Sequence, residues 1–114
     1  MILDFTRYRF FIRPGITDLR KAINGLTVLV QNEMKNDPFA KSLYLFCNRQ
    51  RKLLKIVYWD KNGFCLWQKR LEKQKFPWPQ TSEEAREIRY EQLSMLLEGI
   101  DFFQAHKELS FSRV

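Results

Sequence analysis

The sequence predicts an α+β domain: an antiparallel β-meander with an additional N-terminal strand, one long amphipathic helix packed on the sheet and a short C-terminal helix. Three observations predict this class. The first third of the chain holds a strand pattern and then a helical pattern, the middle holds three strand-like runs separated by turns, and a second helical pattern follows. The 114 residues, 45% of them hydrophobic, suffice for one core. We therefore expect a single domain over residues 1–102 and a frayed C-terminal tail over residues 103–114.

The N-terminal strand is expected at residues 7–13, RYRFFIR. Tyr8, Phe10 and Ile12 occupy every second position, which is the period of a half-buried strand. The Pro14–Gly15 pair then ends the strand, because proline cannot donate to the ladder and glycine favours a turn.

The long helix is expected from Asp18 to about Asn36. Thr17 is the predicted N-cap, and Pro38 disfavours helix at the residue before it. The apolar residues of this segment recur at steps of four, three, four and four, which places them on one helix face. They are Leu19, Ile23, Leu26, Val30 and Met34. Gly25 lies inside this pattern, and we interpret it as a point of close approach between helix and sheet.

The meander is expected at residues 43–48, 53–59 and 64–71. Asn62–Gly63 between the last two runs is a strong hairpin signal. The middle run is apolar on both faces, and Lys55 is its only charge, so we expect it between the other two strands.

A non-repetitive arm follows the meander at residues 72–81, where two prolines prevent regular structure. Phe76 and Trp78 are expected to dock this arm on the core. Residues 82–89 are acidic and are expected to be irregular. The short helix should then run from about Tyr90 to Glu98 and end at a glycine.

The positive charge is concentrated in the middle of the chain. Lys and Arg number 20 against 13 Asp and Glu, a net charge of +7. Residues 41–75 alone hold ten basic and two acidic residues, a balance of +8. Such an excess attracts polyanions, of which nucleic acid is the commonest in the cytoplasm. Two alternatives stay open: lysines that solubilise the sheet and protect its edges, and an acidic protein partner.

The residues of enzyme, metal and membrane sites are sparse. The single histidine, His106, falls in the expected tail, so a Ser-His-Asp or Cys-His site is not expected. Cys47 and Cys65 lack the spacing of a zinc site, and no glycine-rich phosphate loop is present. No run approaches the ~20 apolar residues of a membrane span, and the first ten residues do not resemble a signal peptide. We expect a cytoplasmic, non-catalytic protein without cofactor, metal or small-molecule substrate.

Aromatic residues make up 15% of the chain, and three of them are tryptophans. Trp59 lies in the central run and is expected in the core. Trp67 and Trp78 have two interpretations, core packing or stacking on the bases of single-stranded nucleic acid.

Three stretches of the sequence carry a family resemblance. They are GITDLRKAINGLTVLV at 15–30, DPFAKSLYLFCNRQRKLLKIVYWDKNGFCLWQKRLEKQKFPWP at 37–79, and QLSMLLEGID at 92–101. Together they closely resemble the IS66 Orf2-like (TnpB) accessory proteins of bacterial insertion sequences. The most specific block is KIVYWDKNGFCLWQKRLE at 55–72 with the FPWP that follows it. Two departures are Ala22, where glycine is expected, and the acidic segment at 82–91.

The resemblance implies an accessory role in transposition and no reaction of its own. Members of this family are encoded beside a separate, larger transposase, which carries out the strand chemistry, and beside a small helix-turn-helix protein. The family offers no catalytic residues to carry over. DNA, most directly the ends of the insertion sequence, and these two proteins are therefore the expected partners.

We expect the basic meander and the arm to contact DNA phosphates, which position a protein without specifying a sequence. The candidate residues are Arg49, Arg51, Lys52, Lys61, Lys69, Arg70, Lys73 and Lys75, with Arg20 and Lys21 at the start of the long helix. The alternative is a protein-interaction module that docks its basic face on the transposase or the sister accessory protein without binding DNA.

Overall fold

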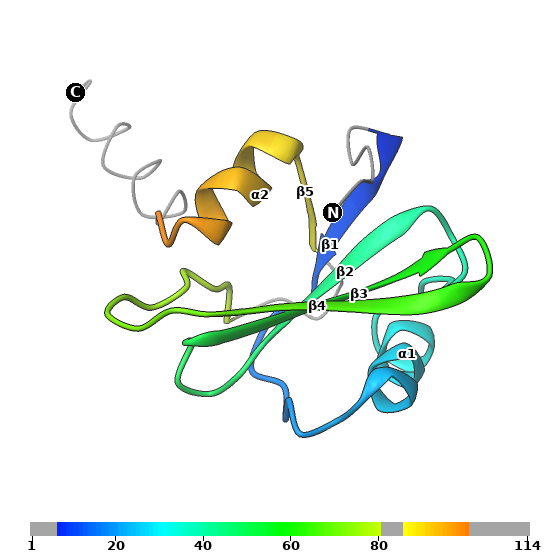
Figure 1. The fold of residues 1–114 in the computed structure, drawn as a ribbon, viewed down its shortest axis with the longest axis horizontal. Coiled ribbons are helices and arrows are strands. Elements are labelled where there is room, and N and C mark those ends of the chain that lie inside the picture. The colour runs from blue at the N-terminus through cyan, green and yellow to red at the C-terminus, as the bar shows by residue number, and fades with distance from the viewer. Residues whose placement is uncertain (1–6, 81–85, 101–114) are drawn as a thin grey trace.

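The computed structural model describes residues 7–80 and 86–100, which form one five-stranded sheet and two helices (Figure 1). The expected tail over residues 103–114 lies outside these ranges. In chain order the elements are β1 (Arg9–Ile12), α1 (Ile23–Asn32), β2 (Ser42–Cys47), β3 (Leu53–Asp60), β4 (Gly63–Arg70), β5 (Arg86–Ile88) and α2 (Tyr90–Leu97). The α+β class and the meander β2–β3–β4 are confirmed.

The strands lie in the order β4-β3-β2-β1-β5. The meander pairs are antiparallel, whereas β1 pairs with β2 in parallel, with Phe10 opposite Leu43. A parallel neighbour requires a crossover connection, and the segment containing α1 provides it. The sequence left this strand order open, because the alternation within β1 identifies a strand but not its partner.

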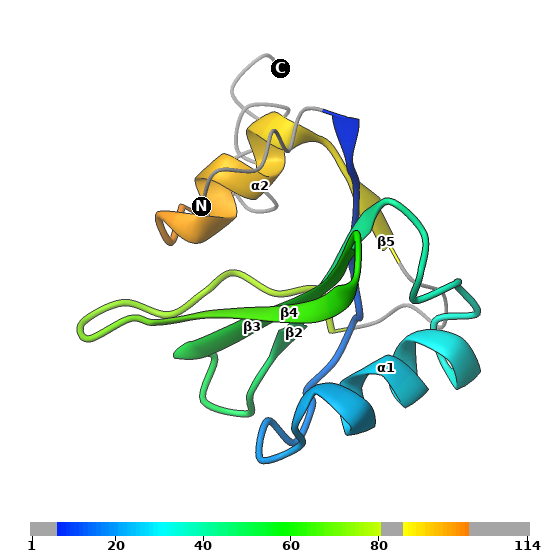
Figure 2. The same cartoon turned by 45° about the vertical axis from the view of Figure 1, so that its right-hand side comes forward.

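The sheet is buried on both faces by different elements. In Figures 1 and 2, α1 lies below the sheet and α2 lies above it. The arm of residues 71–80 lies between α2 and the sheet, as Figure 2 shows. The α1-side core contains Phe11, Leu19, Leu26, Val30, Met34, Tyr44, Phe46 and Val57. The α2-side core contains Phe10, Ile12, Leu43, Leu45, Cys47, Leu54, Ile56, Tyr58, Phe76, Trp78, Ile88, Leu93 and Leu96. All six residues of β2 are buried, since this strand has neighbours on both edges and cover on both faces.

Helix α1 is shorter than predicted, with ten residues that begin at Ile23 rather than Asp18. The predicted N-cap was wrong: Ala22 holds that position, and Thr17 is instead buried, donating its N–H to the Cys47 carbonyl at 2.8 Å. That bond keeps the chain beside the end of β2, so Leu19 reaches the core from a turn. At the other end, Lys35 has a φ of 56°, which turns the chain out of the helix.

The interpretation of Gly25 was also wrong. The three atoms nearest to a Cβ built at Gly25 all belong to the Lys21 side chain, at 3.1–3.5 Å, and none belongs to the sheet. The glycine therefore does not bring α1 closer to the strands.

Strand β5 lies within residues 82–89, for which the sequence predicted irregular structure. It pairs with β1 in antiparallel orientation, with Ile88 opposite Phe10, and buries Ile88 in the α2-side core. The Arg9 guanidinium donates to both carboxylate oxygens of Glu87 at 2.8 Å. The strand was missed because three residues with one apolar side chain give no local period. Helix α2 begins at Tyr90, as predicted.

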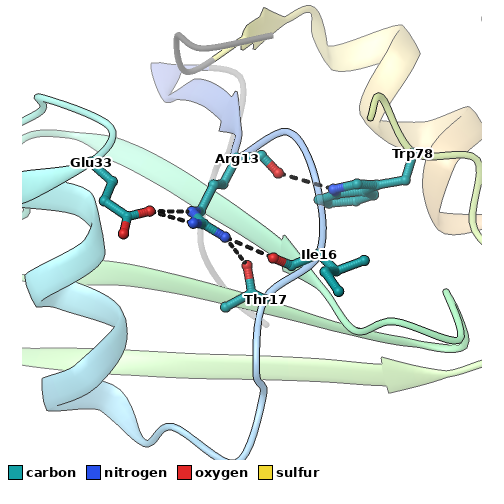
Figure 3. Close-up of polar contacts among 5 residues, drawn as sticks. All are labelled: Arg13, Ile16, Thr17, Glu33 and Trp78. Carbon is teal, nitrogen blue, oxygen red and sulfur yellow. Dashed lines mark hydrogen bonds and ion pairs between the residues drawn. The ribbon is translucent and has the colours of Figure 1, made fainter. Parts of the chain in front are cut away.

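Arg13 joins four segments of the fold (Figure 3). Its guanidinium donates to the Ile16 carbonyl at 2.9 Å, to the Thr17 hydroxyl at 2.8 Å, and to the Glu33 carboxylate beyond the end of α1. Its carbonyl accepts the indole N–H of Trp78 at 2.9 Å. The arm is thereby fixed on the core, and the predicted docking of its two aromatic side chains is confirmed by their burial.

Candidate nucleic-acid interface

The β2–β3 turn and the arm after β4 lie side by side. The N–H of Leu71 donates to the Lys52 carbonyl at 2.8 Å, and the N–H of Phe76 donates to the Arg51 carbonyl at 2.7 Å. Residues 72–75 therefore form a loop whose two ends are both fixed to the turn. We call the five basic residues of the turn and the loop the basic end surface. They are Arg49, Arg51, Lys52, Lys73 and Lys75.

The turn that carries three of these five residues is ordered by Asn48. Its side-chain oxygen accepts the N–H groups of Lys52 and Leu53, each at 3.1 Å, and its own N–H donates to the Leu53 carbonyl. Arg51 adopts a φ of 58°, in the left-handed region that few side chains occupy. Asparagine is suited to such turns because its side chain replaces a backbone acceptor.

The basic end surface is unpaired with acid within residues 7–80 and 86–100. The carboxylates in those ranges make four ion pairs, and none includes one of its five residues. The Lys52 ammonium donates to a backbone carbonyl, that of Glu72, at 3.3 Å. Arg49, Lys73 and Lys75 are exposed. Unpaired, exposed cations on two adjacent loops are suited to the phosphates of a nucleic acid backbone.

Three other predicted contact residues are engaged within the protein. The Lys69 ammonium donates to the Leu97 carbonyl at 2.7 Å, which places a cation at the C-terminus of α2. Arg70 forms an ion pair with Glu72 at 3.2 Å, and both side chains are more than 70% exposed, so this pair is weak. Arg20 holds the carboxylate of Asp18, whose pKa is well below its ordinary value for that reason.

The remaining two predicted residues lie elsewhere. Lys21 precedes α1, on the opposite face of the sheet from the arm, and makes no ion pair with any described residue. Lys61 is in the β3–β4 turn, at the opposite end of the strands from the β2–β3 turn. It borders an open hollow of about 480 Å³ that also contacts Arg7 and Lys41. This grouping could not be predicted from the sequence, because its members are separated by 20 or more residues.

The structure favours core packing for Trp78 and Trp67, and only Trp59 differs from its prediction. Trp78 is 5% exposed, with its indole N–H bonded inside the protein, so it offers no face for a base. Trp67 is half-buried against the α2-side core. Trp59, predicted in the core, is half-buried and lines the hollow.

The two cysteines lie on different strands of the meander, Cys47 on β2 and Cys65 on β4. Both thiols are free, and burial raises the pKa of Cys47 to about 12 although Arg51 acts in the opposite direction. In residues 7–80 and 86–100, no three His, Cys, Asp or Glu side chains are grouped so that they hold a metal ion. No helix in these ranges is sufficiently long and apolar to span a membrane.

Comparison with known proteins identifies one family. A family model described as IS66 Orf2 like protein matches residues 8–107. Uncharacterized protein y4hO of Sinorhizobium fredii is 39% identical over 94 residues, which is 82% of this chain and 82% of the relative. Uncharacterized protein y4jC of the same species is 29% identical over 100 residues, 88% of this chain and 86% of the relative. No solved structure matches the chain.

Proposed function

The chain belongs to the IS66 Orf2-like family of transposition-associated accessory proteins, and from this premise we propose that it binds duplex DNA through the basic end surface and assists a separate transposase. The observation that carries the proposal is the convergence of five basic side chains, none paired with a carboxylate of the described residues, on two loops that backbone hydrogen bonds hold together. Membership of the family supports a role in transposition, and the basic end surface supports contact with DNA phosphates.

The five cations that define the surface are suited to phosphates, which attract arginine and lysine whatever the DNA sequence. Phosphate contacts fix register and orientation and carry no sequence information. The protein would thus hold DNA for the transposase without recognising its sequence. The complex with the transposase would then determine which DNA site is bound.

Salt dependence gives the number of contacts. Each phosphate neutralised on B-DNA contributes about −0.9 to the slope of log affinity against log salt. Five cations set an upper limit of about −4.5, and three engaged cations give about −2.7. Fluorescence anisotropy on an element-end duplex and on a scrambled duplex, across a salt series, measures this slope and any preference between them.

Charge reversal on each of the two loops tests the surface. Arg49→Glu and Lys73→Glu should each weaken duplex binding and reduce the slope by about one unit, and the double variant should lose both contributions. Lys35→Glu is the matched control, because it reverses one exposed lysine just beyond the end of α1. Equal binding by the double variant and the control would refute the proposal.

The same variants distinguish DNA binding from the alternative, in which the surface docks on the transposase or the helix-turn-helix protein. In that case the double variant would retain its DNA affinity and lose co-purification with the partner. Loss of DNA binding with partner binding kept supports the DNA-binding proposal instead.

A further inference from the structure

A second polar surface lies at the other end of the strands from the basic end surface. It is the open hollow of about 480 Å³ between the β3–β4 turn, the segment of residues 37–41 and the start of β1. A volume of this size is in the range of small-ligand sites. The DNA-binding proposal makes no use of it.

Three cations surround the hollow. Arg7, Lys41 and Lys61 are exposed, and none is in an ion pair with a carboxylate of residues 7–80 or 86–100. Among the described residues that line the hollow, Asp60 is the one acid, so these residues carry a formal charge of +2. Lys61 has a φ of 52°, a conformation in which glycine would be less strained, so the chain holds a lysine at the rim at a conformational cost.

Three aromatic rings, those of Tyr8, Phe39 and Trp59, also line the hollow. Phe39 is 57% exposed, which is unusual for a phenylalanine, yet its position is fixed by its neighbours. Its ring centroid lies 5.0 Å from that of Trp59, at 69°, and 5.2 Å from that of Phe64. Across the hollow, the Lys41 ammonium is 5.4 Å from the centre of the Tyr8 ring. Rings held in place and left open to solvent provide a surface on which another flat ring can stack.

We propose that this hollow binds an unpaired nucleotide of single-stranded nucleic acid, with the base stacked on Phe39 and its edge against Trp59, and its phosphates held by Arg7, Lys41 and Lys61. Aromatic stacking beside a cationic groove is the usual combination for single strands, because every base has a π-face and every linkage a negative charge. A duplex offers its phosphates but not its base faces. An acidic peptide would satisfy the cations and leave the rings unused.

The experiment compares three labelled 15-mers, a dT strand, an rU strand and a DNA duplex, by fluorescence anisotropy. Phe39→Ala should weaken binding of the single strands about tenfold and leave duplex binding unchanged. Phe39→Tyr should restore the single-strand affinity, since it retains the ring. Val28→Ala is the matched control, because Val28 is 50% exposed on α1 and lies outside the lining. The two strands show whether deoxyribose or ribose is preferred.

A purely structural role for Phe39 predicts a different result, a lower melting temperature with unchanged single-strand affinity, and that outcome overturns the proposal. No single-strand binding by the wild-type protein at low salt also overturns it. So does equal competition by a poly-glutamate peptide of the same length. Absence of duplex binding refutes only the proposal that the basic end surface binds duplex DNA. The two proposals are tested separately, because Arg49→Glu and Phe39→Ala change opposite ends of the sheet.

A measurement on the wild-type protein makes the test independent of folding of the variants. The three tryptophan indole N–H signals resolve in one nitrogen–proton correlation spectrum. Titration with the dT strand should shift the Trp59 signal and leave that of Trp78, which is bonded to the Arg13 carbonyl in the core, unmoved. A Trp59 signal that does not move while the strand binds refutes the assignment.

Discussion

Replacing Arg13 with methionine removes the guanidinium that joins β1, the 16–17 segment and the end of α1, and retains most of the aliphatic stem. The side chain is only 23% exposed, so its hydrogen bonds are partly shielded from water. The change isolates the polar contribution, because the methionine fills the space of the stem.

The expected decrease in the free energy of unfolding is the sum over the three acceptors that lose a hydrogen bond from the guanidinium. Thr17 is 5% exposed, and leaving its hydroxyl without this donor costs about 1–2 kcal/mol. The Ile16 carbonyl lies on an exposed segment and regains water, which limits its share to about 0.5 kcal/mol. The Glu33 carboxylate is half exposed and contributes about 0.5 kcal/mol. The sum is about 2–3 kcal/mol, which corresponds to a fall of about 10 °C in the melting temperature of a domain this size.

Urea unfolding followed by tryptophan fluorescence measures this difference, and an unchanged m-value shows that the folded state is otherwise intact. Arg20→Met is the control, since its ion pair with Asp18 is on a side chain that is 91% exposed and should contribute little. A double-mutant cycle with Thr17→Val should show coupling of about 1 kcal/mol. An Arg13→Met effect as small as that of Arg20→Met would refute the reasoning.

Two further changes test other parts of the fold. Gly25→Ala should raise the free energy of unfolding by about 0.5–1 kcal/mol, because α1 gains helix propensity and a shift of a few tenths of an ångström at Lys21, which precedes α1, makes room for the new Cβ; a loss of stability in urea unfolding would contradict this. The Arg9 guanidinium holds the pKa of Glu87 below its ordinary value of 4.5, so the stabilisation from this pair is present at neutral pH and is lost as the pH falls below about 4.5. NMR titration of the Glu87 carboxyl should give a midpoint below 4.5 that returns to the ordinary value in Arg9→Gln, whereas equal midpoints would show that the pair does not form.

The parts of the fold that the sequence predicted are those with local causes. The β3–β4 hairpin follows from Asn62–Gly63 and from the strand patterns on either side of it. The arm docks as expected because Phe76 and Trp78 are large apolar side chains in a segment that two prolines keep from forming helix or strand. The basic end surface was predicted in outline for the same reason, since its residues lie in one charged stretch of the chain.

The parts that were missed depend on partners distant in sequence or on backbone bonds. Thr17 has the chemistry of an N-cap, but its N–H is bonded to Cys47, and this tertiary contact delays the helix to Ile23. Strand β5 forms because residues 86–88 pair with the edge of β1 that β2 does not occupy. The hollow unites residues from three separate segments, and Trp59 and Phe39 look like core residues in any local pattern. No short stretch of the sequence contains both partners of any of these contacts.

The pairing of β5 with β1 has a consequence for how the chain folds. Arg9 and Glu87 are 78 residues apart, so this contact raises the contact order of a small domain and closes a loop that spans most of the chain. During synthesis, β1 leaves the ribosome first and acquires its second neighbour almost last. Until residues 86–97 emerge, one edge of β1 and the α2-side core remain open to other nascent chains. Residues 86–97 therefore complete the second edge of β1 and the α2-side core only after the rest of the sheet has been synthesised.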